Sequence, residues 1–366
     1  MKPDKTADEL VKYIPQPLWN NWYIKEKIGK GAYSSVYRAE ARRSGRNDSA
    51  AIKIEPITDS KNRPEKIQEK RTMAETESAI MYKLRKCPNI VAYEDELLGE
   101  LRVKDKSAGY YFIIRMELLD NVYRLMTKKK FDYSEENVLR LAIETGTGLK
   151  AAHDIGVIHR DIKLENFFVS PEGTYKLGDF NISLFSSSTR SYAGTKGYMA
   201  PEVFRMKDDL ESSYTAQADI YSFGVCLYQI MNGAKLPFQE ECKAEEAINR
   251  RLSGEHLKKP ANASDAFGDV ILKACAYDKA DRYQSMDMML ADLKKCCEVP
   301  AENTEPDKDG EAQESSKPLN TDLLLRLIAA VMIVGIIAAL IFGIYSIKSD
   351  KERTETALTD TREDFV

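Results

Sequence analysis

The chain has 366 residues, 43% hydrophobic and 31% charged, proportions ordinary for a globular protein with a sizeable core. Its formal net charge of −4 gives no overall basic field, which argues against a nucleic-acid partner. The six cysteines have no C-x-x-C spacing and only three histidines accompany them, so we expect reduced thiols in the cytosol rather than disulfides or a metal centre.

Residues 1–21 form a polar, proline-containing stretch. We expect an extended lead-in, of which Ile14, Leu18 and Trp19 pack on the following domain. Residues 1–9 carry lysines without an apolar core behind them, so they do not resemble a secretory signal peptide.

A glycine turn between two strands is predicted next. Residues 23–28 alternate like a strand, Gly29 and Gly31 lie in a turn over 29–34, and 35–39 resume a strand. Glycines let a backbone approach phosphates and direct amide hydrogens at them. A lone Gly-x-Gly is weak evidence, but a following strand disfavours a dinucleotide fold, in which a helix would follow.

Lys53 lies in an apolar, strand-like run over residues 50–54. A buried lysine needs an anionic partner, and the helix predicted over 67–84 offers Glu75 and Glu77. The alternative is a lysine that reaches solvent from an edge strand.

Further elements follow in order. Aromatic and β-branched residues predict a strand over 110–119, and apolar periodicity predicts helices over 123–129 and 135–153. Residues 167–169 and 174–177 predict a short hairpin.

Residues 159–166 read H-R-D-I-K-L-E-N and combine groups suited to phosphoryl transfer. Asp161 can orient a hydroxyl and accept its proton, Lys163 can stabilise phosphoryl charge, and Asn166 can hold a divalent metal. The alternative is a solvated charged turn.

The octapeptide matches the H-R-D-x-K-x-x-N catalytic loop of protein kinases, so the chain resembles a eukaryotic-like serine/threonine protein kinase. Ala50-Ala51-Ile52-Lys53 is similar to that family's V-A-I-K motif, and Asp179-Phe180-Asn181 stands at its D-F-G site. The resemblance implies an α+β, bilobal kinase fold over residues 22–297, with an N-lobe over 22–117 and a C-lobe over 118–297.

By this resemblance the site residues take specific roles. Lys53 and Lys163 neutralise phosphate charge, and Asp161 orients the acceptor hydroxyl. Glu77 is the partner of Lys53, because it precedes Leu84 by the family's spacing to a Pro-Asn-Ile-Val sequence. The cofactors are ATP and Mg²⁺, with Mn²⁺ as the alternative, and the metal ligands are Asn166 and Asp179.

The same resemblance implies a nucleotide pocket in which Met116 is the gatekeeper and Glu117 and Leu118 offer hinge backbone groups. The expected ATP-binding residues are Ile28, Gly29, Lys30, Gly31, Ala32, Tyr33, Ser34, Val36, Ala51, Lys53, Met116, Glu117 and Leu118. Two residues depart from the pattern: Ser34 stands at the third glycine, and Asn181 replaces the D-F-G glycine, which bears on how readily that loop switches.

A hydroxyl-rich stretch over residues 186–192 predicts an activation loop, with phosphorylation expected within 182–195 and the phosphate paired with Arg160. An ordinary flexible loop is the alternative. Residues 194–202 resemble the substrate-docking segment, where Thr195 favours serine and threonine acceptors. The family also implies that Asp219 anchors the catalytic loop backbone. It further implies that Arg282 pairs with Glu202, a buried pair whose disruption costs about 3–5 kcal/mol.

The C-terminal region changes character. Residues 298–322 predict an acidic disordered linker, 323–347 a transmembrane helix and 348–366 a polar tail. Residues 327–347 are uncharged over 21 positions, enough to cross a bilayer core; a buried soluble helix is the alternative. The order resembles bacterial membrane-anchored kinases.

Charge and chemistry disagree on orientation. Four basic residues follow the span and two precede it, which alone would place the tail inside. ATP chemistry requires a cytoplasmic kinase domain, and we expect that orientation in a single-pass membrane protein. Small residues at four-residue spacing, Gly335, Ala339 and Gly343, suggest a homodimer.

The predicted function is therefore membrane-associated signalling by a serine/threonine protein kinase, activated by activation-loop autophosphorylation. The partners are ATP and proteins that carry serine or threonine. The rival hypothesis is a pseudokinase, a membrane-tethered binding module that has lost phosphoryl transfer. A small-molecule kinase is a second alternative, against which the docking segment argues.

Overall fold

The computed structural model describes residues 7–31, 34–43, 46–59, 61, 63–103, 106–180, 196–205 and 214–298. The chain divides into two units, Met1–Pro300 and Ala301–Val366, and the second lies outside the described residues, with the predicted linker, span and tail. Among the helices that are described, none has the length and apolarity that a membrane crossing needs.

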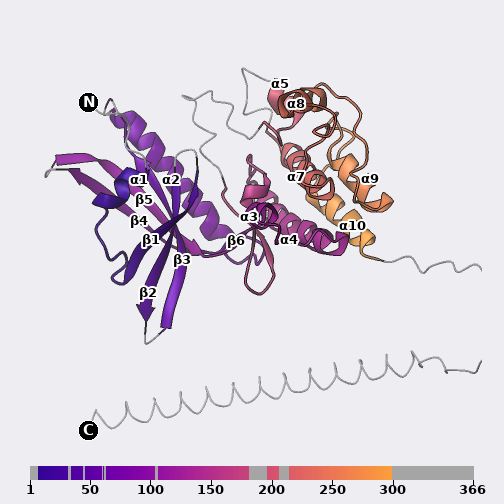
Figure 1. The fold of residues 1–366 in the computed structure, drawn as a ribbon. Helices are drawn as coiled ribbons and strands as arrows, with labels where there is room; N and C mark the ends of the chain where they lie inside the picture. The colour runs from indigo at the N-terminus through magenta and orange to yellow at the C-terminus, as the bar shows by residue number, and fades with distance from the viewer. Residues whose placement is uncertain are drawn as a thin grey trace, which may run out of the picture. The chain divides into compact units, whose positions relative to one another are not determined.

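A five-stranded antiparallel sheet forms the first lobe, in the order β1-β2-β3-β5-β4 (Figure 1). The strands are β1 (Trp22–Lys30), β2 (Ser35–Arg43), β3 (Arg46–Ile57), β4 (Tyr93–Val103) and β5 (Lys106–Glu117). Strand β4 was not predicted from the sequence. Its residues, Y-E-D-E-L-L-G-E-L-R-V, are rich in acids, as suits an edge strand with one neighbour.

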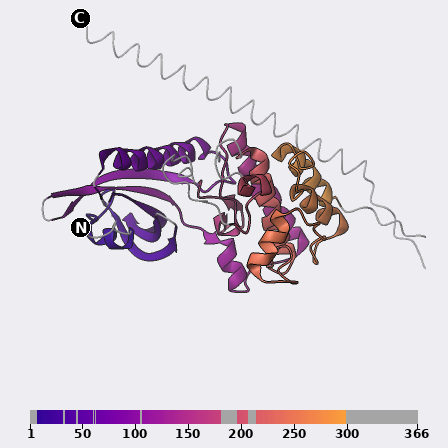
Figure 2. The ribbon, with the colours of Figure 1, turned by 90° about the horizontal axis from the view of Figure 1, so that it is seen from above.

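The two faces of this sheet carry different partners, and Figure 2 shows the sheet between them. Helix α2 (Pro64–Leu84) packs Ala74 and Met81 against Phe112 and Ile114 on the inner face. The outer face packs against the N-terminal segment, defined here as residues 7–21. Successive side chains of a strand point to opposite faces, so Ile113, between Phe112 and Ile114, belongs to the outer core.

The prediction of an extended N-terminal segment is wrong for its first residues. The segment begins with α1 (Ala7–Leu10) and a 3₁₀ turn, η1 (Val11–Tyr13). Leu10, Ile14 and Leu18 are buried at four-residue intervals, each burial stabilising the fold by roughly 1.5–3 kcal/mol. Trp19 is only half-buried, and its ring lies 4.7 Å from the Arg115 guanidinium.

The second lobe is mostly helical. Its elements are α3 (Val122–Thr127), α4 (Glu135–Asp154), α5 (Pro201–Arg205), α7 (Ala216–Met231), α8 (Ala244–Leu252), α9 (Asp265–Ala274), α10 (Met286–Cys296), the 3₁₀ turn η2 (Leu164–Asn166), and a small sheet of β6 (Asp120–Asn121), β7 (Phe167–Val169) and β8 (Tyr175–Leu177). Ser134, Ser264 and Ser285 cap α4, α9 and α10 by accepting a backbone N–H. The bilobal fold that the sequence predicts is therefore present.

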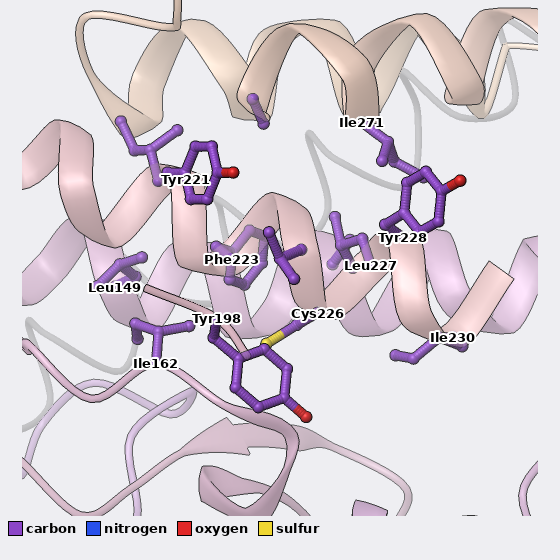
Figure 3. Packing of buried hydrophobic residues seen from close by; sticks show 14 of the residues in the cluster. Leu149, Ile162, Tyr198, Tyr221, Phe223, Cys226, Leu227, Tyr228, Ile230 and Ile271 are labelled. Carbon is purple, nitrogen blue, oxygen red and sulfur yellow. The ribbon is translucent and has the colours of Figure 1, made fainter. Parts of the chain in front are cut away.

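Helix α7 lies at the centre of this lobe, with apolar side chains buried all around it, as a core helix requires. Figure 3 shows Tyr221, Phe223 and Leu227 of α7 among side chains from neighbouring elements, including Leu149 and Ile271. The two lobes meet where Leu177 of β8 exchanges backbone hydrogen bonds with Asn89 (2.8 Å) and Val91 (2.9 Å). The residues after β8 are thereby brought close to the first lobe, where Asp179 contacts Lys53.

Candidate active site

Lys53 on β3 is the centre of a charged cluster between the lobes. Its Nζ lies 2.5 Å from Glu77 Oε1, 2.9 Å from Asp179 Oδ1 and 3.1 Å from Glu55 Oε1. Lys53 and Glu77 are buried, whereas the Asp179 side chain keeps 38% of its surface exposed. A carboxylate that is paired yet accessible can also reach a ligand.

Strand and helix periodicity explain this placement. Ile52 and Ile54 enter the outer core, so Lys53 between them must point to the inner face, where α2 lies. The buried stripe of α2 includes Glu77 and directs it at the sheet. Glu75, the other candidate in the sequence, instead pairs with Arg71 at the surface, 2.7 Å away. The lysine thus has the partner that the sequence reasoning selected.

Glu55 is a third partner that the sequence reasoning missed. A signal was available, because residues two apart on a strand share a face and Glu55 stands two residues after Lys53. Burial works against the ammonium, but Asp179, Glu77 and Glu55 together raise the pKa of Lys53 well above its ordinary value. Lys53 in turn lowers the pKa of Asp179 despite the cost of desolvation, so both groups are charged. For Glu77 the effect of burial is larger than that of Lys53, so the pKa of this carboxyl is raised.

The loop over residues 159–166 brings three polar side chains together. Lys163 Nζ lies 2.5 Å from Asp161 Oδ2, and the Asn166 amide donates to the Asp161 carbonyl at 2.7 Å. Burial opposes the charged amine, but the Asp161 carboxylate raises the pKa of Lys163. Asp161 therefore has a fixed cation beside it and a backbone that is held in place by Asn166.

Asp219 of α7 fixes the backbone of this loop. Its buried carboxylate accepts the backbone N–H groups of His159 (2.8 Å) and Arg160 (2.9 Å), and His153 Nε2 lies 2.9 Å from it. Arg160 has a φ of +67°, a left-handed conformation that costs a non-glycine residue free energy. The two hydrogen bonds to a carboxylate offset that cost and fix the direction in which Asp161 leaves the loop.

Asp179 is positioned by its neighbours in the same way. Its φ of +58° is also left-handed. The preceding residue, Gly178, donates its N–H to the Asn166 carbonyl at 3.0 Å and accepts from His159 Nε2 at 3.0 Å. The following residue, Phe180, is buried with its ring 4.7 Å from that of His159. Asp179 is thus tied to the catalytic loop on both sides.

The donor chemistry of Asn166 and Asp179 fits magnesium. Both offer oxygen, the ligand that Mg²⁺ prefers, and this ion is usually held by one or two carboxylates together with substrate phosphates. In the described part of the chain no group of three or more His, Cys, Asp or Glu side chains forms a site that protein ligands complete alone. A metal shared with a phosphate ligand suits such a donor set.

The glycine turn joins β1 to β2, and two of its residues, Ala32 and Tyr33, lie outside the described residues. Gly31 N–H donates to the Ser34 carbonyl at 2.9 Å, and a Cβ on Gly31 would lie 2.7 Å from Ser34 Oγ. A side chain at Gly31 would therefore require the Ser34 hydroxyl to move. The other expected contacts in this part, Ile28, Lys30 and Val36, lie on β1 and β2.

Among the other residues expected to contact the nucleotide, Ala51 pairs in register with Met116 on β5. The Glu117 carboxylate accepts from Lys176 Nζ at 2.7 Å, and the Glu117 amide donates to the Ala92 carbonyl at 3.1 Å. These bonds fix the segment that leads into Leu118 and the second lobe. The Glu117 backbone N–H is therefore engaged with Ala92, and the hinge role of Glu117 and Leu118 stays a prediction.

Beyond the catalytic loop, Arg282 forms a two-pronged ion pair with Glu202 at 2.7 and 2.8 Å, as expected. The remaining expectations concern Asn181, the activation loop over 182–195 and Thr195, all of which lie outside the described residues.

The comparisons with known proteins agree with this geometry. The family model described as "Protein kinase domain" matches residues 22–293. The chain is 28% identical over 277 residues, 75% of its length, to Serine/threonine/tyrosine-protein kinase HT1 of Arabidopsis thaliana. It is 31% identical over 288 residues to Myosin-IIIa of Mus musculus, again 75% of its length. It is also 28% identical over 297 residues, 77% of its length, to a Clostridium perfringens protein with the name "Probable serine/threonine-protein kinase". The matches cover 66%, 17% and 39% of these three relatives, respectively.

Proposed function

This chain belongs to the protein kinase family, and from that premise we propose that it transfers the γ-phosphoryl group of ATP to serine or threonine hydroxyls of other proteins. The observation that carries the proposal is the meeting of Lys53, Glu77 and Asp179 at one point. These residues come from β3, from α2 and from the segment after β8, so their meeting requires both lobes to be in place.

Each residue has a separate role in the proposed reaction. Lys53, held by Glu77, binds phosphate oxygens. Asp161 orients the acceptor hydroxyl and receives its proton, and Lys163 beside it stabilises charge on the transferred group. Asn166 and Asp179 would hold Mg²⁺, which when bound neutralises phosphate charge. The Asp219 hydrogen bonds keep Asp161 in position for this step.

A radiolabelled phosphate-transfer assay tests the proposal. Asp161→Asn preserves the side-chain shape but cannot accept a proton. We expect transfer to a serine- and threonine-containing protein to fall by roughly a hundredfold or more, the usual contribution of a general base. ATP binding should change little.

The rival, a pseudokinase, predicts ATP binding without transfer in the natural protein. Transfer that persists unchanged in Asp161→Asn would remove Asp161 from its assigned role. Asp154→Asn is a matched control, because this acid pairs with Lys150 at the surface of α4.

Two further parts of the proposal concern residues outside the described ranges. We propose that residues 323–347 tether the kinase domain to a membrane with the domain in the cytoplasm, on the support of the uncharged run over 327–347. Protease accessibility of a C-terminal tag on intact cells tests the orientation.

We also propose autophosphorylation within 182–195. Site mapping after incubation with ATP and metal tests it, and the absence of phosphate from that stretch would contradict it.

A further inference from the structure

Asp8 on α1 contacts both strands that flank the glycine turn. Its carboxylate accepts from Lys27 Nζ on β1 at 2.5 and 2.7 Å. From β2 it accepts the Ser35 hydroxyl at 2.9 Å and the Tyr37 hydroxyl at 2.6 Å. One side chain from the N-terminal segment thus joins the two strands on either side of the phosphate-binding turn.

The partners of Asp8 differ from it in burial. Ser35 and Tyr37 expose only 2% and 7% of their surface, whereas the Asp8 side chain exposes 44%. Buried hydroxyls that lose an acceptor pay a desolvation cost, so the carboxylate matters more to these hydroxyls than its own exposure suggests. Hydrogen bonds from Lys27 and Tyr37 lower the pKa of Asp8 to about 2, so the acceptor is ionised at neutral pH.

The rest of the N-terminal segment keeps Asp8 in place. Leu10, Ile14 and Leu18 are buried in the core on the outer face of the sheet, together with Tyr37 and Ile54. These apolar contacts join the N-terminal segment to the first lobe, and Asp8 lies just before the first of these residues, Leu10. The segment therefore holds Asp8 against β1 and β2 rather than leaving it on a free terminus.

The strand register connects Asp8 with the nucleotide side of the sheet. Ser35 and Tyr37 point to the outer face, so Val36 between them points to the inner face. Val36 pairs with Gly29 on β1 and with Lys53 on β3. A Cβ on Gly29 would lie 3.4 Å from Val36 Cβ, an ordinary van der Waals distance, so Gly29 and Val36 are direct packing neighbours. The residues bound by Asp8 thus flank the one that supports both Gly29 and Lys53.

We infer that Asp8 is a positioning residue for ATP binding, which acts from the outer face of the sheet by fixing β1 and β2 at the base of the glycine turn. The inference rests on the proposed function for its link to ATP, but the effect on the two strands does not depend on it. Loss of Asp8 loosens the hairpin and leaves the catalytic loop untouched, so ATP affinity falls while the chemical step is preserved.

The test compares Asp8→Ala and Asp8→Asn with Glu9→Ala in the full chain. Glu9 is the neighbouring exposed acid and is the matched control. We expect amide hydrogen exchange over residues 27–37 to accelerate roughly tenfold in Asp8→Ala, and the KM for ATP to rise roughly three- to tenfold. We expect kcat to stay within about twofold, with both parameters unchanged in Glu9→Ala.

Tyr37→Phe is the second variant, because it removes one donor to Asp8 without changing charge or shape. It should move exchange and KM in the same direction by a smaller factor. Unchanged exchange over 27–37 in Asp8→Ala overturns the inference, as does a fall in kcat at constant KM. If the natural protein neither binds nor uses ATP, the proposed function fails, and the exchange measurement alone then decides whether Asp8 holds the two strands.

Discussion

The ion pairs of Arg282 and of Lys53, both in the described part of the chain, differ in how completely their charges are matched. Arg282 meets Glu202 through two parallel hydrogen bonds, and its other N–H groups donate to the carbonyls of Ala276 (2.6 Å) and Tyr277 (3.0 Å). Lys53 instead faces the three carboxylates of the cluster with a single ammonium group.

The difference indicates what each pair can do. The Arg282 pair is saturated, so a change can only break it, and its contribution is to stability. The Lys53 cluster has more negative charge than its ammonium can balance, and one of its carboxylates remains accessible. Such a cluster gains from binding a divalent cation with phosphates, so its contribution is to ligand binding.

Breaking the saturated pair should give the largest effect on stability. Arg282 is fully buried, and Arg282→Met leaves Glu202 without its cation. We expect the free energy of unfolding to fall by about 3–5 kcal/mol, measured by urea denaturation.

The control is Arg250→Met, which removes an arginine that pairs with Glu241 at 2.9 Å and with Glu255 near the surface. Exposed pairs contribute about 0–1 kcal/mol, so the control should change stability little. Equal losses in the two variants would contradict the distinction between the pairs.

Breaking the unsaturated cluster should affect activity more than stability. Glu77→Gln removes a buried carboxylate and leaves Lys53 with Glu55 and Asp179. We expect kcat/KM for ATP to fall roughly ten- to a hundredfold, because Lys53 loses its closest partner and shifts toward the other two. The free energy of unfolding should change by less than about 1 kcal/mol, since the desolvation cost of Glu77 disappears together with its ion pair.

Glu75→Gln is the matched control, on the same helix but paired with Arg71 at the surface. Kinetics at varied ATP and urea denaturation separate the two effects. A loss of stability in Glu77→Gln as large as in Arg282→Met would show that both pairs are structural.

The residues of this cluster differ in how far the sequence could predict them. Lys53, Asp161 and Asp179 stand in short motifs whose spacing is chemically specific, and Glu77 follows from helix periodicity. The strands and helices with clear apolar periodicity could be predicted for the same reason. Strand β4 could not, because its exposed edge carries acids instead of an apolar alternation.

Contacts that depend on packing between elements were harder to predict. Asp8 acts across 27 residues on Ser35 and across 29 on Tyr37, and its partners are set by how α1 packs on the sheet. No local pattern around Asp8 indicates that packing. Glu55 is intermediate, since its shared face with Lys53 follows from strand periodicity, but its distance from the ammonium depends on side-chain placement.

Glu55 supplies the finest test of the comparison and the smallest expected effect. Glu55→Gln removes the most distant of the three carboxylates, at 3.1 Å, and keeps the side-chain volume. If the cluster carries excess negative charge, relieving it should let ATP phosphates compete better for Lys53, and the KM for ATP should fall about two- to fivefold. The matched control is Glu40→Gln on β2, whose carboxylate pairs with Arg38 at 2.7 Å away from the cluster. A KM that rises in Glu55→Gln would mean that Glu55 helps to hold Lys53 in place, and the cluster would then resemble the saturated Arg282 pair.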